Sequence, residues 1–260
     1  MFVKSCAQLC IGIALFVGQY ITIEAIEPSD SLGGFHRPIV TITYDDAWVS
    51  QYEEAFPLLK KYKMFATFYI LTGSLGKPGY MTTDQILDLY KAGHEIGAHT
   101  VTHPDLSTIP AYQVQQELKN SQDFLENLIK HPVPDFAAPY GSVSYDAVKL
   151  IKQFYKTNRS VTFGFNTKNT FDPFKIKALA ISASTSFAAV KQFLENTSKH
   201  HVWAVLVYHR IGGEANQTNI SVAEFETHLQ EIQKQNLTIL TLQQALQELL
   251  PQITNTNADF

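Results

Sequence analysis

Two adjacent aspartates, Asp45 and Asp46, stand directly after an apolar segment that is typical of a β-strand. Neighbouring side chains of a strand point to opposite faces, so one carboxylate can face the mouth of a barrel while the next turns toward its rim. Two carboxylates this close repel each other. Keeping both in place is costly unless a cation or an acid-base role compensates. The pair therefore indicates metal or proton-transfer chemistry, with a solvated turn or a helix cap as the alternative.

Two histidines, His99 and His103, are four residues apart after another predicted strand. A single turn of chain brings both imidazoles to one side, and two neutral imidazoles with one carboxylate suit a catalytic zinc or a similar ion. Because the chain has nine histidines, such a spacing can also arise by chance. His94 lies just before the same strand, where we expect a structural role.

A turn and a further histidine complete the candidates. Residues 136–141 predict a strand that ends in a turn, where a proline and a glycine fix the backbone and can aim the Tyr140 amide into the mouth. His209 ends another apolar strand and can act as an acid or a base near neutral pH. The alternatives are an ordinary strand-to-loop turn and a packed histidine with a satisfied ring.

These residues lie at the ends of predicted strands, in a chain where strand-like and helix-like segments alternate. Strands rich in β-branched or aromatic residues are expected at residues 39–44, 65–71, 95–99, 136–139, 160–163, 179–182, 203–209 and 238–242. Helices are expected at residues 52–62, 83–92, 111–128, 145–155, 187–198, 222–235 and 242–250. Ser221 with Glu224 predicts a capping box, and Thr82 or Thr83 can cap the second helix.

The alternation predicts an α/β fold with a parallel sheet, because parallel strands need crossover connections. About seven or eight such units favour a barrel over an open sheet, and parallel barrels carry their chemistry at the carboxyl ends of the strands. We expect a single domain over residues 36–250 and a polar tail at residues 251–260.

The first 25 residues differ from the rest of the chain. Lys4 precedes an apolar run, and Ala25 offers a small residue for cleavage, as a secretory signal requires. An uncleaved membrane anchor is the alternative, at the lower edge of the length that spans a bilayer. Both cysteines, Cys6 and Cys10, lie in this segment, so the remainder has no disulfide and no thiol nucleophile. We expect a signal peptide at residues 1–25, a secreted or periplasmic, cell-envelope protein, and no stable membrane span after processing.

Composition narrows the class of protein further. The chain has 260 residues and is 45% hydrophobic, which suits one large globular domain. Its formal net charge is -4 and it has no long run of lysine or arginine, so a nucleic acid is not an expected partner. We expect a monomer.

Four motifs in this order resemble the polysaccharide deacetylase family (carbohydrate esterase family 4, the NodB homology domain), and more closely its branch with poly-N-acetylglucosamine deacetylases. The motifs are Thr43-Tyr44-Asp45-Asp46-Ala47, His99-Thr100-Val101-Thr102-His103, Phe136-Ala137-Ala138-Pro139-Tyr140-Gly141 and Leu206-Val207-Tyr208-His209. The match extends over residues 38–250. The resemblance implies a distorted (β/α)7-type barrel that removes acetyl groups from N-acetylglucosamine units of a polysaccharide.

The resemblance also implies roles for single residues. The implied ligands of a divalent metal, with Zn²⁺ expected first and Co²⁺ or Ni²⁺ also suited, are Asp46, His99 and His103. Asp45 is implied as the general base, His209 as the general acid, and the Tyr140 backbone N–H as a donor to the oxyanion. This base and acid predict a bell-shaped pH–rate profile. An aspartate that orients His209 is also implied; Asp172 is the candidate, against an ordinary turn residue before a proline.

Three positions depart from the common family pattern. Ala47 replaces a glycine, and Arg210 stands where many relatives have aspartate. Ala137 stands where many members have the arginine that holds the base carboxylate. We therefore expect Arg159 or Arg210 to supply the positive charge beside Asp45.

A sugar polymer needs an open groove with aromatic faces. The candidates in predicted loops near strand ends are Trp48, Tyr80, Tyr140 and Phe171. The expected partner is an acetylated glycan, namely a biofilm glucan, peptidoglycan or chitin, with O-acetylated xylan as a further option. Two other functions stay open: a metal hydrolase of the same fold with a small amide or O-acetyl substrate, and a non-catalytic carbohydrate-binding protein.

Overall fold

The computed structural model describes residues 33–213 and 218–253, and within them strands and helices alternate as predicted. The strands are β1 (Ile39–Tyr44), β2 (Ala66–Ile70), β3 (Glu95–Ala98), β4 (Asp135–Ala137), β5 (Thr157–Arg159), β6 (Leu179–Ala180), β7 (Trp203–Tyr208) and β8 (Thr238–Ile239). The α-helices are α1 (Phe56–Tyr62), α2 (Thr83–Lys91), α3 (Ala111–Ile129), α4 (Tyr145–Phe154), α5 (Phe187–His200), α6 (Val222–Lys234) and α7 (Leu242–Ile253). Shorter helical turns are η2 (Gln51–Ala55), η3 (Thr72–Ser74) and η4 (Pro139–Gly141).

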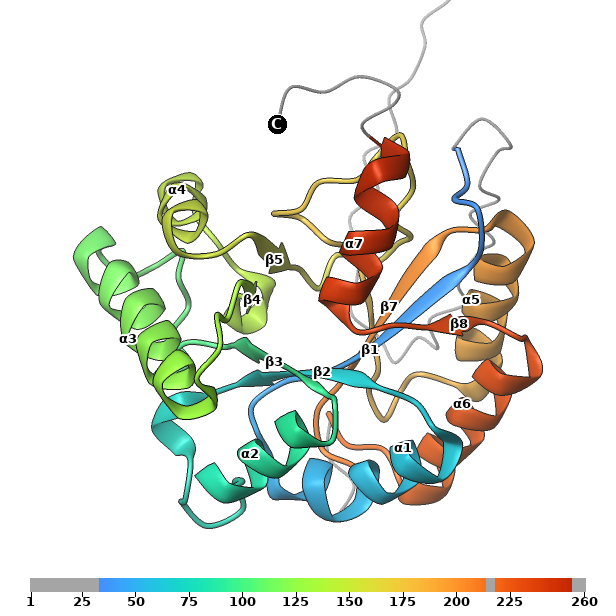
Figure 1. Cartoon of the computed structure of the whole chain (residues 1–260), viewed down its shortest axis with the longest axis horizontal. Helices are drawn as coiled ribbons and strands as arrows, with labels where there is room; N and C mark the ends of the chain where they lie inside the picture. The colour runs from blue at the N-terminus through green and yellow to red at the C-terminus, as the bar shows by residue number, and fades with distance from the viewer. Residues whose placement is uncertain (1–32, 214–217, 254–260) are drawn as a thin grey trace, which may run out of the picture.

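The strands form one curled parallel sheet in the order β5-β4-β3-β2-β1-β7-β6, and β8 pairs with β1 off this path (Figure 1). The central strand β1 lies between β2 and β7, with Ile39 opposite Trp203. The two edges also meet, because Arg159 forms a single bridge with Ile176 just ahead of β6. This irregular closure confirms the distorted barrel, built as a single domain.

The fifth strand lies earlier in the chain than predicted. β5 is Thr157–Arg159, whereas residues 160–163 form no strand and two of their apolar side chains are exposed. β-Branched and aromatic residues favour a strand at 160–163. The strand instead forms where the polar side chains of Thr157 and Arg159 are buried. Thr157 donates a hydrogen bond of 2.6 Å to Asp135, and Arg159 is fully buried inside the barrel.

Two apolar cores lie on opposite faces of the sheet, because alternate residues of a strand point to opposite sides. Val40 and Ile42 of β1 belong to the larger core, which also receives side chains of α1 to α6. Val205 and Val207 of β7 belong to the smaller core, which includes side chains of α7. Figure 1 shows α7 on the side of the sheet away from α1 and α2.

Helix ends agree with the sequence signals except at two places. The capping box at Ser221 and Glu224 is present, and Thr82 caps α2. The first predicted helix is divided into the π-helical turn η2 and α1. α7 continues three residues beyond its predicted end, through Pro251 to Ile253, because the Ile253 side chain is buried in the smaller core.

The predicted signal segment, residues 1–25, lies outside the described residues, and so do residues 254–260 of the predicted tail. Both assignments stay predictions. Among the helices of residues 33–213 and 218–253, none has the length and apolar character that a membrane span requires.

Candidate active site

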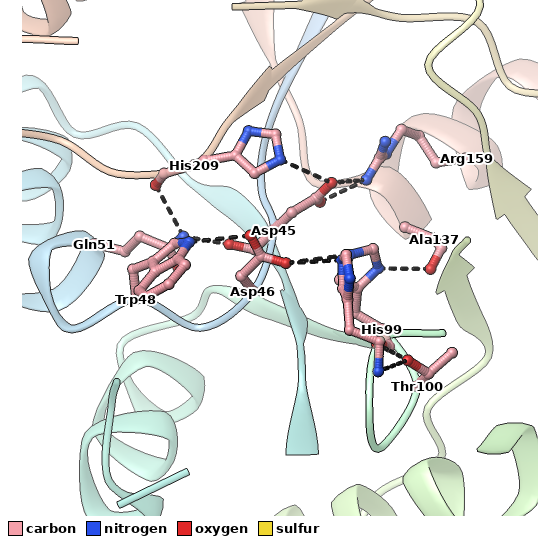
Figure 2. Close-up of polar contacts among 10 residues, drawn as sticks. Asp45, Asp46, Trp48, Gln51, His99, Thr100, Ala137, Arg159 and His209 are labelled. Carbon is pink, nitrogen blue, oxygen red and sulfur yellow. Dashed lines mark hydrogen bonds and ion pairs between the residues drawn. The ribbon is translucent and has the colours of Figure 1, made fainter. Parts of the chain in front are cut away.

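The candidate residues lie at or just after the carboxyl ends of β1, β3, β4, β5 and β7, all strands of one parallel sheet. Figure 2 shows Asp45, Asp46, His99, Arg159 and His209 gathered at one place. Val205 and Val207 face inward, and the same alternation carries His209 inward. Tyr44 pairs with Tyr208 in the β1–β7 register, so Asp45 and His209 follow side by side. The Asp45 N–H donates to the Tyr208 carbonyl at 3.0 Å, which extends the pairing by one residue.

Asp46, His99 and His103 form a group that fits a metal ion. One ligand atom from each of the three lies within 4.8 Å of the other two. Asp46 Oδ1 lies 3.4 Å from His99 Nε2 and 3.3 Å from His103 Nε2. That oxygen is buried and has no hydrogen-bond partner among the described residues. Two imidazole nitrogens with one carboxylate oxygen are a donor set for Zn²⁺ and similar cations, so the residues present fit the implied metal.

The charge state of the group is set by its own contacts. Burial alone would raise the pKa of the Asp46 carboxyl, but the close approach of the His103 and His99 rings to Oδ1 holds that pKa far below its usual range. The His99 ring lies 2.7 Å through Nδ1 from the Ala137 carbonyl. A carbonyl at this nitrogen favours the tautomer with the proton on Nδ1, which leaves Nε2 free to bind a cation.

The loop that carries His103 is held by a residue that the sequence did not indicate. Thr100 and His103 both have positive φ, at 65° and 62°. The Glu117 carboxylate on α3 accepts hydrogen bonds from the backbone N–H groups of Val101 and Thr102 at 2.7 and 2.9 Å. Glu117 lies in the middle of a helical pattern, so nothing in the sequence distinguishes it from a solvated helix residue.

Asp45 and Arg159 form a buried ion pair. Arg159 Nη2 lies 2.5 Å from both carboxylate oxygens of Asp45, and the Arg159 side chain has no exposed surface. Arg159 lies directly opposite Ala137 in the register of β4 and β5. The guanidinium therefore reaches Asp45 from the strand next to the position where many family members carry an arginine. Arg210, the other predicted partner, stacks on Trp48 instead.

His209 approaches the other side of the same carboxylate. Its Nε2 lies 3.9 Å from Asp45 Oδ2, whereas its buried Nδ1 has no hydrogen-bond partner among the described residues. Asp172 does not orient this ring, because its carboxylate accepts the Phe174 N–H at 2.8 Å in a local turn. The turn interpretation of Asp172 is therefore the correct one.

Gln51 joins the two strand ends that carry the acid and base candidates. Its Nε2 donates to the Asp45 carbonyl at 2.5 Å and to the His209 carbonyl at 2.9 Å. Gln51 is fully buried and begins the π-helical turn η2. Such turns are frequent at functional sites, but their position does not follow from hydrophobic periodicity. Sequence reasoning therefore missed this residue.

Tyr140 lies beside the group formed by Asp46, His99 and His103. Its ring centroid is 4.6 Å from that of His103, and the residue is 66% exposed. The predicted turn is present, with positive φ at Tyr140 and Gly141. A Cβ on Gly141 would lie 2.5 Å from a side-chain carbon of Val161, so the close approach of these segments requires glycine.

Two of the four predicted groove aromatics have other roles. Trp48 is stacked between Tyr80 and Arg210, so it offers no free face to a sugar. Phe171 packs on Trp203 at 5.8 Å between centroids and contributes to the smaller core. Tyr140 alone among the four predicted residues is largely exposed.

His94 has the structural role that its position predicted. The Ala66 N–H donates to its Nδ1 at 3.2 Å, and the ring packs edge-on against Phe56 and Phe68. Burial lowers the pKa of His94 to about 4. The ring is therefore neutral at physiological pH and belongs to the core rather than to the site.

The fold and the site define a class of protein: a distorted parallel barrel with an Asp–His–His group and a buried aspartate–arginine pair at the carboxyl ends of its strands. Residues 33–157 match the family model described as "Polysaccharide deacetylase". Over these residues the chain is similar to the polysaccharide deacetylase family, which confirms the resemblance carried by its motifs.

Two curated relatives show the extent of the similarity. YxkH of Bacillus subtilis (strain 168) is 30% identical over 137 residues, which cover 52% of this chain and 49% of the relative. The poly-beta-1,6-N-acetyl-D-glucosamine N-deacetylase of Staphylococcus aureus (strain MSSA476) is 28% identical over 149 residues, with coverage of 52% and 51%. The chain thus spans about half the length of the curated relatives it matches.

Solved structures extend the similarity to the whole barrel. The Streptococcus pyogenes deacetylase PplD, in complex with acetate, is 25% identical with a TM-score of 0.55 and covers 58% of this chain and 68% of its own. The Xyl-CE4 domain of a multidomain xylanase from the hindgut metagenome of Trinervitermes trinervoides has a TM-score of 0.59 at 19% identity. It covers 81% of this chain and 90% of its own, and it shows the fold alone.

Proposed function

We propose that this chain is a metal-dependent hydrolase that removes the acetyl group from N-acetylglucosamine units of a polysaccharide. The observation that carries the proposal is that two adjacent carboxylates have different surroundings. Asp46 faces two imidazoles, whereas Asp45 lies between the Arg159 guanidinium and the His209 ring. The family and its poly-N-acetylglucosamine N-deacetylase relative support the substrate class.

Asp46, His99 and His103 would hold the divalent cation. Zn²⁺ is our first candidate, and the same donors accept Co²⁺ or Ni²⁺. When bound, such a cation polarises the acetyl carbonyl and lowers the pKa of a water molecule to about 7. This assistance suits an acetamide, which is a poor electrophile with a poor leaving group.

Asp45 accepts the proton of the attacking water as general base. The Arg159 guanidinium pairs with this buried carboxylate and fixes its direction, because a charge-assisted contact to both oxygens leaves little freedom to rotate. The buried position is tolerable only while the two charges stay paired. Arg159 is therefore a positioning residue for the base.

His209 and Tyr140 complete the reaction. His209, protonated, donates a proton to the leaving nitrogen of the sugar. The backbone N–H of Tyr140 donates to the oxygen on which negative charge develops, and one such preorganised donor contributes about 3 kcal/mol. We further propose that the enzyme acts outside the cytoplasm, because residues 1–25 have the charged, apolar and small-residue order of a secretory signal.

Acetate release by the full chain tests this function. The chain is loaded with Zn²⁺, Co²⁺ or Ni²⁺ and given β-1,6-linked N-acetylglucosamine oligomers, chitin oligomers, peptidoglycan or acetylated xylan. We expect release from an N-acetylglucosamine polymer, and a loss of about 10²- to 10⁴-fold in Asp45→Asn. Asp172→Asn is the matched control and should keep full activity, since an amide oxygen can replace its turn contact.

Two outcomes would favour the alternatives. Hydrolysis of small amides without hydrolysis of any oligosaccharide would indicate a small-substrate enzyme of the same fold. Tight binding of a glycan without acetate release, in the metal-loaded chain, would indicate a carbohydrate-binding protein.

A further inference from the structure

Trp48 lies beside the metal-binding group without belonging to it. Its indole Nε1–H donates to Asp46 Oδ2 at 3.0 Å (Figure 2). The other oxygen, Asp46 Oδ1, is the one that faces His99 and His103. The two oxygens of the Asp46 carboxylate therefore have separate partners. Because the indole holds Oδ2, Oδ1 is the oxygen that points to the histidines.

The indole that makes this contact is itself held on both faces. The Tyr80 ring stacks on it at 4.3 Å between centroids and 23° between planes. The Arg210 guanidinium carbon lies 3.6 Å from the Trp48 ring centroid. Two groups this close to one centroid cannot share a face, so Tyr80 and Arg210 must lie on opposite sides of the indole.

The backbone fixes the same arrangement. Ala47, one residue before Trp48, accepts the Met81 N–H at 2.8 Å, and Val49 donates to the Gly79 carbonyl at 2.9 Å. An isolated antiparallel bridge joins the two residues that carry the stacked rings. Contacts among three segments that are distant in sequence, those of Trp48, Tyr80 and Arg210, thus fix the orientation of the indole.

We propose that Trp48 is a positioning residue that fixes Asp46 as a metal ligand through one oxygen, and that Tyr80 and Arg210 fix Trp48. The inference rests on the proposed metal site. Outer partners of metal ligands set the orientation of the ligands, and their loss typically lowers metal affinity about 10- to 100-fold. Arg210, which departs from the common family pattern, has its role here rather than beside Asp45.

Metal affinity of the full chain tests the proposal independently of catalysis. Co²⁺ binding is measured by competition with a chromophoric chelator, together with the visible spectrum of the bound ion. Trp48→Phe keeps a ring for stacking and removes only the N–H. We expect its Co²⁺ affinity to fall about 10- to 100-fold and its visible spectrum to change, because the freed oxygen can then also approach the ion.

Trp203→Phe is the matched control. It removes the other tryptophan N–H of the chain, which donates to Thr41 at 2.9 Å inside the barrel, and should leave Co²⁺ affinity unchanged. Circular dichroism checks that each variant is folded. If Trp48→Phe does not fold, Tyr80→Ala, which removes the stack and keeps the indole N–H, must still lower Co²⁺ affinity.

The outcomes separate this inference from the proposed function. Wild-type affinity and spectrum in folded Trp48→Phe, or in Tyr80→Ala where Trp48→Phe does not fold, would overturn the role of the indole and leave the deacetylase proposal intact. A rise in KM for oligosaccharide with unchanged Co²⁺ affinity would show Trp48 to be a sugar contact, which also overturns it. Failure of the wild-type chain to bind any divalent cation would overturn the proposed function itself.

Discussion

The Arg159 guanidinium contacts both carboxylate oxygens of Asp45, and it does so from β5, one strand away from the position where many relatives carry an arginine. Ala137 occupies that position, directly opposite Arg159 in the register. The positive charge beside the proposed base therefore comes from β5 and not from the position of Ala137 on β4.

Arg159→Ala should destabilise the fold and abolish most activity. It leaves the Asp45 carboxylate buried without its partner, which costs about 3 to 5 kcal/mol. Urea denaturation at pH 7 measures the loss of unfolding free energy, and acetate release measures the loss of activity. Arg37→Ala is the control, because it removes a half-exposed arginine that pairs with Glu248 ahead of β1 and does not contact Asp45.

The register of β4 and β5 predicts a partial rescue. In the double variant Ala137→Arg with Arg159→Ala, an arginine again lies on a strand beside Asp45, so part of the lost unfolding free energy should return. If Arg159→Ala and Arg210→Ala each kept the full kcat, neither arginine would support the base.

Metal binding should stabilise the chain by mass action. Zn²⁺ at about 100 times its Kd should add about 2.7 kcal/mol to the free energy of unfolding. Asp46→Asn should lose this increment, because the oxygen that faces the two histidines loses its charge. Thermal melts with and without Zn²⁺ measure the effect. His131→Gln removes an exposed histidine and should respond to Zn²⁺ as the wild type does.

A carboxylate pair, the fully buried Asp135 and the partly buried Glu95, lies at the amino ends of β4 and β3, away from the site. Gln243 of α7 donates its backbone N–H to Glu95 at 2.8 Å and its side-chain amide to both Asp135 oxygens at 2.8 and 2.7 Å. Burial and then the Asp135 carboxylate raise the pKa of Glu95 well above its usual range. The folded chain thus holds a proton that the unfolded chain releases above a pH of about 4.5.

Stability should therefore fall as pH rises from about 4.5 toward the raised pKa of Glu95. Glu95→Gln keeps an acceptor for Gln243 and cannot ionise, so it should unfold less readily than the wild type at pH 8 and show a flatter pH dependence. Urea denaturation at pH 5, 6.5 and 8 compares the two. Glu53→Gln, at an exposed position, should follow the wild type. An equal dependence of unfolding free energy on pH in wild type and Glu95→Gln would contradict a proton held by Glu95 in the folded chain.

His94 should affect the pH dependence of stability in the opposite direction to Glu95. Burial lowers its pKa from 6.5 to about 4, so the unfolded chain binds the proton first. Its contribution to the free energy of unfolding is on the order of 3 kcal/mol. This contribution is complete above pH 6.5 and is lost as the pH falls to 4. Nuclear magnetic resonance of the His94 ring should show the neutral form at pH 5. A charged ring at that pH would show that burial does not control it.

The positions of Asp45 and His209 were predictable because each directly follows a fully buried strand that contains no Asp, Glu, Lys, Arg or His. Arg159 could not be placed in the same way. Its strand is short and polar, and its partner lies 114 residues away in the sequence, so neither periodicity nor propensity marks it. Only tertiary burial explains why this segment, rather than the more apolar 160–163, pairs with β4.

Trp48 shows a second limit of sequence reasoning. An aromatic residue in a loop near a catalytic motif suggests a sugar-binding face, but Tyr80 and Arg210 cover both of its faces. These three residues come from separate loops, and their meeting depends on how the barrel brings strand ends together. The types of the site residues are therefore predictable from local patterns, whereas their supporting contacts are not.

The central position of β1 has a consequence for how the molecule folds. β1 is the first strand of the described chain, yet Thr43 donates a hydrogen bond to Leu206, 163 residues later. Contacts of such long range are slow to form, because a large loop must close before they contribute. Asp46, His99 and His103 all precede β4, but the acid candidate His209 reaches Asp45 only when β7 joins β1. A chain released during synthesis before β7 would therefore carry the three proposed metal ligands without the proposed proton donor, and we expect the complete site to form late in folding.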